Sequence, residues 1–208
     1  MAKIADKSEK SDDGVGPEED GGARFEAVVH RPANGAEAGG GAGGEDGVWG
    51  FVRLPTAVSG ALPRRGRATV EVRIAGGEVF QEVAEPDGRK GHWVRIRGPR
   101  LEAAGLGLGE TASFEVRPAA EEPEPRLPAD LRQMLKDDGP ARATWDATTT
   151  WARVDWVHWI ESAKRSATRA KRIADARQML GEGKKRVCCF DPSGFYSKAL
   201  SAPEAADD

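Results

Sequence analysis

Apolar and polar residues alternate along most of the segment between residues 24 and 117, and glycine-rich turns interrupt this alternation. A period of two places successive side chains on opposite faces of a strand, so the pattern predicts strands with one buried and one solvated face. In residues 68–74, three aliphatic side chains share one face, whereas Glu71 and Arg73 share the other. The predicted strands are residues 24–30, 48–54, 68–74, 78–83, 92–97 and 111–117.

Six short strands in one segment leave sheet edges that must be protected, which favours closure into a small β-barrel or sandwich. We expect no helix between these strands. Gly76 and Gly77 predict a tight hairpin between the third and fourth strands. Residues 31–47 are rich in glycine and predict a flexible loop, but they lack the pattern of a phosphate-binding loop.

The pattern changes after the last strand. Four prolines in residues 118–128 predict an extended linker, and the apolar period then becomes that of α-helices. Leu131, Met134 and Leu135 mark the buried side of a first helix, and we expect a longer helix from about Val154 to Leu180. The fold class is therefore α+β, with a six-stranded small β-barrel followed by a helical module. The predicted organisation is a disordered acidic tail (1–22), a barrel domain (24–118), a linker (119–127), a helical module (128–187) and a C-terminal tail (188–208).

Residues 159–173 form a basic segment in a chain whose formal net charge is −3. If this segment lies within the long helix, a stripe from Trp156 to Ala174 that includes Ala167 and Ala170 packs against a neighbour, and the bases face solvent. We favour this interpretation. The alternative is an anion or nucleic-acid contact, since a basic patch is the electrostatic footprint of such binding. Its candidate residues are Lys164, Arg165, Arg169, Lys171 and Arg172.

Few residues point to catalysis or metal binding. The three histidines have no metal-ligand spacing, so we expect no metal and no cofactor. Cys188 and Cys189 are adjacent, and we expect reduced thiols packed as small hydrophobic side chains. No apolar run has the length of a membrane span, and the N-terminus lacks the apolar core of a signal peptide. We therefore expect a cytoplasmic protein without a membrane partner.

The aromatic residues offer a second candidate site. Four of the six tryptophans lie between residues 145 and 159, a position typical of side chains that anchor a helix to another element. A ligand groove between the barrel and the helices is the other interpretation, because ligand pockets form preferentially between packed elements. The candidate groove residues are Trp49, His92, Trp156 and Trp159.

Several short motifs carry a resemblance to known families. They are residues 25–29, 49–55, 66–76 and 105–116 in the strand region, and "LPADLRQML" (127–135) and "WIESAKRSATRAKRI" (159–173) in the helical region. The first four resemble a bacterial domain of unknown function that forms a small β-barrel, and the last two resemble the helical module of the YdeI/OmpD-associated, or bacteriocin-protection, family. The turn and strand at the end of the barrel are also similar to AbrB-like double-split barrels, which implies DNA binding as an alternative.

The resemblance to the bacteriocin-protection family implies tolerance of antimicrobial peptides or envelope stress, without a known reaction or cofactor. We therefore expect a non-enzymatic, cytoplasmic binding or stress-tolerance protein. Its ligand, an unidentified small molecule or peptide, is expected between the barrel and the helices. A nucleic-acid-binding regulator that uses residues 159–173 is the alternative.

Overall fold

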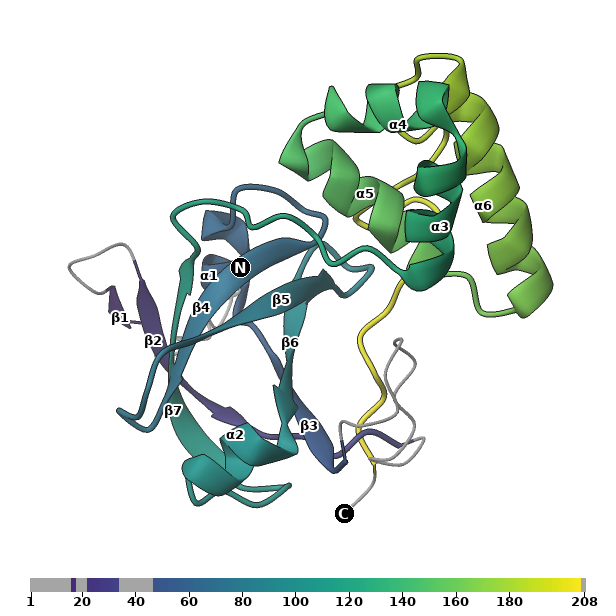
Figure 1. The fold of residues 1–208 in the computed structure, drawn as a ribbon. Helices are drawn as coiled ribbons and strands as arrows, with labels where there is room; N and C mark the ends of the chain where they lie inside the picture. The colour runs from purple at the N-terminus through teal and green to yellow at the C-terminus, as the bar shows by residue number, and fades with distance from the viewer. Residues whose placement is uncertain (1–15, 18–21, 34–46, 207–208) are drawn as a thin grey trace, which may run out of the picture.

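A computed structural model of the chain describes residues 16–17, 22–33 and 47–206. Strands and two short helices form one part of the molecule, and four helices lie beside one end of that part (Figure 1). The first part contains β1 (Gly16–Pro17), β2 (Ala23–Val28), β3 (Trp49–Arg53), α1 (Thr56–Ala61), β4 (Ala68–Ile74), β5 (Phe80–Pro86), β6 (His92–Arg97), α2 (Gly98–Ala103) and β7 (Thr111–Pro118). The second contains α3 (Ala129–Asp137), α4 (Gly139–Asp146), α5 (Thr150–Glu161) and α6 (Ser166–Gly181).

The strands form one antiparallel sheet in the order β1-β2-β7-β4-β5-β6-β3, in which β1 has only two residues. The sheet curls until the residues that follow β2 meet β3. There His30 and Phe51 exchange backbone hydrogen bonds of 2.9 and 3.0 Å. The expected six-stranded barrel is therefore confirmed as a curled sheet of six longer strands, with the two-residue β1 at one edge. β4 and β6 coincide with the predicted ranges, and β5 differs most, beginning two residues later and ending three residues later than expected.

The alternation in β4 follows the prediction, because Val70, Val72 and Ile74 are buried while Glu71 and Arg73 lie on the other face. The predicted hairpin joins β4 to β5. Its turn has positive φ at Ala75 and Gly76, and glycine adopts such a backbone conformation without steric cost.

Two short helices in the strand region correct the expectation that this region contains none. α1 follows Pro55, and α2 has Pro99 in its first turn, where proline is compatible with a helix because no intrahelical donor is lost. Val58 of α1 and Leu101 of α2 are buried in the barrel core. Each helix has only six residues, fewer than two turns, which is too short to give a helical period in the sequence.

The helical module has its own core, and Leu131, Met134 and Leu135 are buried in it as predicted. The long helix expected from Val154 to Leu180 is wrong, because residues 162–165 separate α5 from α6. The break is stabilised by tertiary contacts. The guanidinium of Arg172 donates to the carbonyl oxygen of Trp159 and, at 2.9 Å, to the hydroxyl of Ser162, which satisfies acceptors at the end of α5.

The predicted packing of the basic segment is confirmed at Trp156 and Ile160, which are buried, but it is wrong for the alanines that follow. Ala167, Ala170 and Ala174 are exposed, and the side of α6 that faces the core carries Ala176 and Leu180 instead. The break before Ser166 changes the rotational phase of α6 relative to α5, so a stripe drawn across both helices has no single face. Arg169 and Arg172 instead contact the neighbouring elements, through Asp130 of α3 and the end of α5.

The C-terminal segment, residues 188–206 of the predicted C-terminal tail, runs from the helices back along the barrel (Figure 1). Ala205 forms a bridge with Pro32, and Ala206 donates to the carbonyl oxygen of Arg31 at 2.8 Å. A turn at Asp191 starts the segment: burial opposes ionisation, but hydrogen bonds from Ser193 and the following backbone outweigh it and lower the pKa of Asp191 to about 2. Most of the acidic tail and most of the glycine-rich loop lie outside the described residues, but Gly16–Pro17 of the tail form β1, which pairs with β2.

Candidate ligand-binding groove

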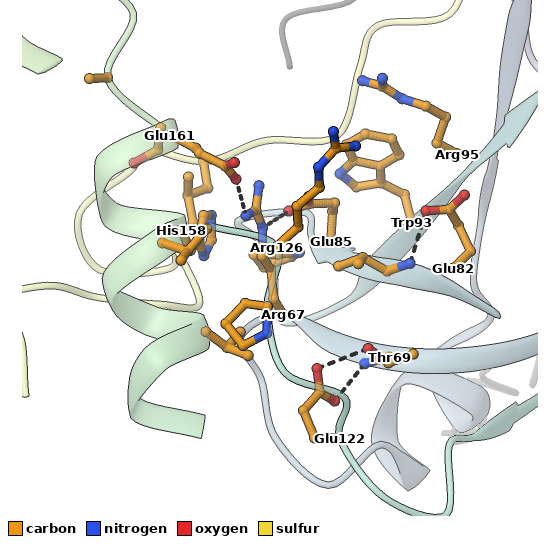
Figure 2. Close-up of a pocket in the computed structure, with 18 of the residues that line it drawn as sticks. Arg67, Thr69, Glu82, Glu85, Trp93, Arg95, Glu122, Arg126, His158 and Glu161 are labelled. Carbon is orange, nitrogen blue, oxygen red and sulfur yellow. Dashed lines mark hydrogen bonds and ion pairs between the residues drawn. The ribbon is translucent and has the colours of Figure 1, made fainter. Parts of the chain in front are cut away.

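A groove with a volume of about 990 Å³ lies between the barrel and α5. Figure 2 shows Trp93 and Glu82 on the strand side and His158 and Glu161 on the helix side. The proline-rich residues 122–126 form part of the wall, and further lining residues come from the turn after α5 and from the C-terminal segment at 199–201. The groove is therefore built from segments that are far apart in the sequence.

Arg67, just before β4, links the two sides of the groove. Its guanidinium donates to Glu85 of β5 at 2.9 Å and to Glu161 of α5 at 2.7 Å. Burial opposes the positive charge, but the two carboxylates outweigh it and raise the pKa of Arg67. Arg67 therefore keeps its positive charge although its side chain is only 20% exposed, and its two ion pairs fix α5 against the barrel.

The linker segment is hydrogen-bonded to both domains. Glu122 accepts hydrogen bonds of 2.9 Å from the backbone nitrogen and the hydroxyl of Thr69 on β4. Glu124 accepts from Arg153 at 2.8 Å and from Thr150 at 2.7 Å, both on α5. The extended linker is thus a fixed wall of the groove.

Two buried ring nitrogens in the groove lining have no hydrogen-bond partner among the described residues. They are Nε1 of Trp93 and Nδ1 of His158. Trp93 is 9% exposed and His158 is 2% exposed. Leaving a buried polar group unsatisfied costs about 1–3 kcal/mol, and such groups are uncommon in native proteins. Of the five such nitrogens among the described residues, these two belong to the groove lining, which makes them candidate contacts for a ligand.

His158 is neutral in this environment. Burial lowers its pKa well below the ordinary value, and the positive charges of Arg67, Arg64 and Arg172 lower it further. Phe190 covers the imidazole edge-on, with ring centroids 5.2 Å apart. A neutral imidazole has one donor and one acceptor nitrogen, so His158 can hydrogen-bond to a ligand without carrying charge.

The four groove residues expected from the sequence do not come together. Trp49 packs with Phe51 and Trp93 under the C-terminal segment. His92 is buried beside the carbonyl oxygen of Gly66 at 3.2 Å. Trp156 lies in the core of the helical module and Trp159 packs edge-on against it, so none of the four lines the groove. The alternative interpretation of these aromatic side chains as groove residues is therefore wrong, and they fill the cores on either side of the groove, as their interpretation as anchors predicts.

The five candidate residues for an anion contact also do not form one site. Arg169 pairs with Asp130 at 2.7 Å, Lys171 pairs with Asp175 at 2.7 Å, and Arg172 is held by the end of α5. Only Lys164 and Arg169 line the groove, and Arg165 and Lys164 are exposed.

The sequence interpretation missed the residues that build the groove: Arg67, Glu85, Trp93, Arg126, His158 and Glu161. One signal was available. Arg126 is the only base in the proline-rich linker "PAAEEPEPRLP", where a single cation among acids is unusual. The Arg67 contacts join residues that are 18 and 94 positions apart, which no local spacing reveals.

Metal and membrane features were searched in residues 16–17, 22–33 and 47–206. Within these ranges no group of three His, Cys, Asp or Glu side chains could hold a metal ion. No helix in the same ranges is both long and apolar enough to cross a membrane. Cys188 and Cys189 are exposed free thiols, which corrects the expectation that they pack as small hydrophobic side chains.

The fold and the groove define a two-domain protein in which a curled β-sheet domain and a helical domain enclose a cleft. Residues 25–116 match the family model of a domain of unknown function, DUF1905. Residues 124–183 match the model of the family described as "Bacteriocin-protection, YdeI or OmpD-Associated". The chain therefore contains a region that matches the DUF1905 model, followed by a region that matches the YdeI/OmpD-associated model, which confirms the resemblance to both. No curated protein matches the chain.

Proposed function

We propose that the protein is a non-enzymatic binding protein of the bacteriocin-protection type, and that its ligand binds in the groove between the two domains. The observation that carries this proposal is the pair of buried, unpartnered nitrogens of Trp93 and His158 in one groove. The groove volume of about 990 Å³ is at the upper end of the ~300–1,000 Å³ typical of small-molecule sites. We include a cytoplasmic location in the same proposal.

The alternative, a nucleic-acid-binding regulator, has less support. Of the five bases that would contact the phosphates, Arg169, Lys171 and Arg172 are already held by groups of the helical module. Aromatic side chains that could stack on bases would have to lie beside these cations. Trp156 is buried in the core, so it is not available for stacking.

A thermal-shift screen of the full chain against small molecules, peptides and oligonucleotides tests the proposal. A ligand present at 100 times its Kd stabilises the folded protein by about 2.7 kcal/mol. Ala163→Trp places a large side chain in the groove, whereas Ala167→Trp is a matched control on an exposed face of α6. We expect ligands that stabilise the wild type and the control but not the groove variant.

Equal stabilisation of the groove variant and the control would place the ligand elsewhere and contradict the proposal. Stabilisation by oligonucleotides alone would favour the regulator instead.

A further inference from the structure

The groups that remain open for recognition in the groove are mainly hydrogen-bond donors. Arg126, from the linker, and Lys164, from the turn between α5 and α6, make no hydrogen bond or ion pair with any residue that the structure describes. Trp93 adds an indole N–H on the strand side. Figure 2 shows Arg126 between α5 and the strands. These three donors come from three different segments of the groove wall.

The carboxylates of the groove are already engaged. Arg67 holds Glu85 and Glu161, and Thr69 holds Glu122. Arg97 holds Glu82, and Arg153 and Thr150 hold Glu124. Glu82, paired with Arg97 at 2.6 Å, is further biased against charge because burial raises its pKa more than Arg97 lowers it. The carboxylates that pair with basic side chains or hydroxyls are Glu82, Glu85, Glu122, Glu124 and Glu161.

The groove also has apolar surface. Val83 and Pro86 of β5, Val157 of α5 and Leu200 of the C-terminal segment line it together with the ring of Trp93. Apolar walls bind the body of a ligand, and a few polar groups determine its orientation. The occupant should therefore combine an apolar part with acceptor groups.

We propose that the ligand of this groove is a small organic anion whose carboxylate or phosphate group is bound by Arg126 and Lys164, with Trp93 as an additional donor. Ionised acceptors make the strongest hydrogen bonds with guanidinium and ammonium donors. A cationic ligand would place its charge beside two unpaired cations and would find the carboxylates occupied. The inference rests on the proposed function, because it specifies the chemistry of the ligand in the same groove.

Four probes with the same aromatic ring separate charge from shape: phenyl phosphate, benzoate, benzyl alcohol and benzylamine. Their binding to the full chain is measured by isothermal titration calorimetry at millimolar probe concentrations. We expect phenyl phosphate, benzoate or both to bind, with affinity that weakens as salt screens the cations, and benzylamine not to bind. The two anionic probes distinguish a phosphate ligand from a carboxylate ligand.

Substitutions locate the anion. Arg126→Gln and Lys164→Gln should each weaken binding of the anionic probe about tenfold, because each removes a charge-assisted hydrogen bond. Arg165→Gln is the matched control: it removes a neighbouring exposed cation that does not line the groove, and it should leave the affinity unchanged. Circular dichroism of each variant verifies that it is folded.

Failure of the inference differs from failure of the proposed function. If benzyl alcohol or benzylamine binds, if Ala163→Trp abolishes that binding, and if the two Gln variants leave it unchanged, the groove binds ligands but not anions. If neither anionic probe binds, the inference is overturned. If Ala163→Trp affects no ligand from the broader screen, the proposed function itself fails.

Discussion

The barrel and the helical module are stabilised in different ways. In the barrel, seventeen buried residues pack inside a continuous antiparallel ladder whose ends meet at His30 and Phe51. In the helical module, Trp145, Trp156 and eight other buried residues of the described part form the core, and ion pairs such as Arg169 with Asp130 connect one helix to another. The barrel is thus specified by backbone pairing and alternating side chains, whereas the helical module depends on a few large buried side chains. Ion pairs occur in both regions. We expect the helical module to be the more vulnerable region.

The largest effect should come from Trp156→Ala. Trp156 is fully buried, and truncation of such a side chain costs about 3–5 kcal/mol. Because the helical core is small, we expect hydrogen exchange to show loss of protection in α3 to α6 while the barrel strands stay protected. Phe114→Ala in the barrel is the matched truncation, and Tyr196→Ala, at a residue that is 84% exposed, should change stability by less than about 0.5 kcal/mol.

Simultaneous loss of protection in both regions of the Trp156→Ala protein would show that they unfold as one cooperative unit. The contrast between the two regions would then be structural but not energetic.

Arg67→Met tests the connection between the regions and should cost about 2–3 kcal/mol, since it leaves two mostly buried carboxylates without their cation. The cost should fall to about 1 kcal/mol when Glu85→Gln and Glu161→Gln are added, because the uncompensated charges are removed. Chemical denaturation of the wild type, Arg67→Met and the triple variant measures these differences. A triple variant no more stable than Arg67→Met would mean that packing of the arginine, not its charge, joins the barrel to α5.

The same contrast explains how much of the structure could be predicted from sequence. The six strands were predictable because the period of two is local, and burial of alternate residues such as Val70 and Val72 follows directly from it. The boundary between α5 and α6 could not be predicted, because no glycine or proline marks it in the sequence. The contact that stabilises it joins Arg172 to Trp159 and Ser162. A helical wheel drawn through that boundary assigned the wrong face to α6.

The candidate site was predictable only in its location. A groove between the barrel and the helices was expected, and the structure contains one. Its residues could not be derived, because the contacts of Arg67 depend on the relative placement of two domains. The expected aromatic residues are instead core residues, as Trp156 illustrates, since a large apolar side chain gains more from burial than from lining a solvated cleft.

Two alanine substitutions on α6 test the corrected orientation of that helix. Ala176 is fully buried, so Ala176→Leu should overpack the helical core and cost about 1–3 kcal/mol. Ala167 is exposed, and Ala167→Leu should change stability by no more than about 0.5 kcal/mol. Thermal denaturation of both variants gives the comparison. A larger cost for Ala167→Leu than for Ala176→Leu would restore the orientation that the sequence suggested.

The smallest effect concerns acid stability of the helical module through His158. An unfolded histidine titrates near pH 6.5, whereas burial and then the charges of Arg67, Arg64 and Arg172 lower the pKa of His158 in the folded protein. Between these two pKa values the unfolded chain binds a proton that the folded chain does not. The stabilising contribution is therefore complete above about pH 6.5 and is lost as pH falls towards the lower, folded pKa, by at most about 1.4 kcal/mol per pH unit.

His158→Phe should remove this share of the pH dependence. Burial also lowers the pKa of His92 in the barrel, so some loss of stability in acid should persist in the variant. The informative quantity is the difference in free energy of unfolding between wild type and variant, measured by urea denaturation from about pH 7 to about pH 5. We expect the wild type to lose stability relative to the variant as pH falls. A constant difference would mean that His158 gains a proton equally in both states, and hence that the helix side of the groove admits enough water to solvate an imidazolium.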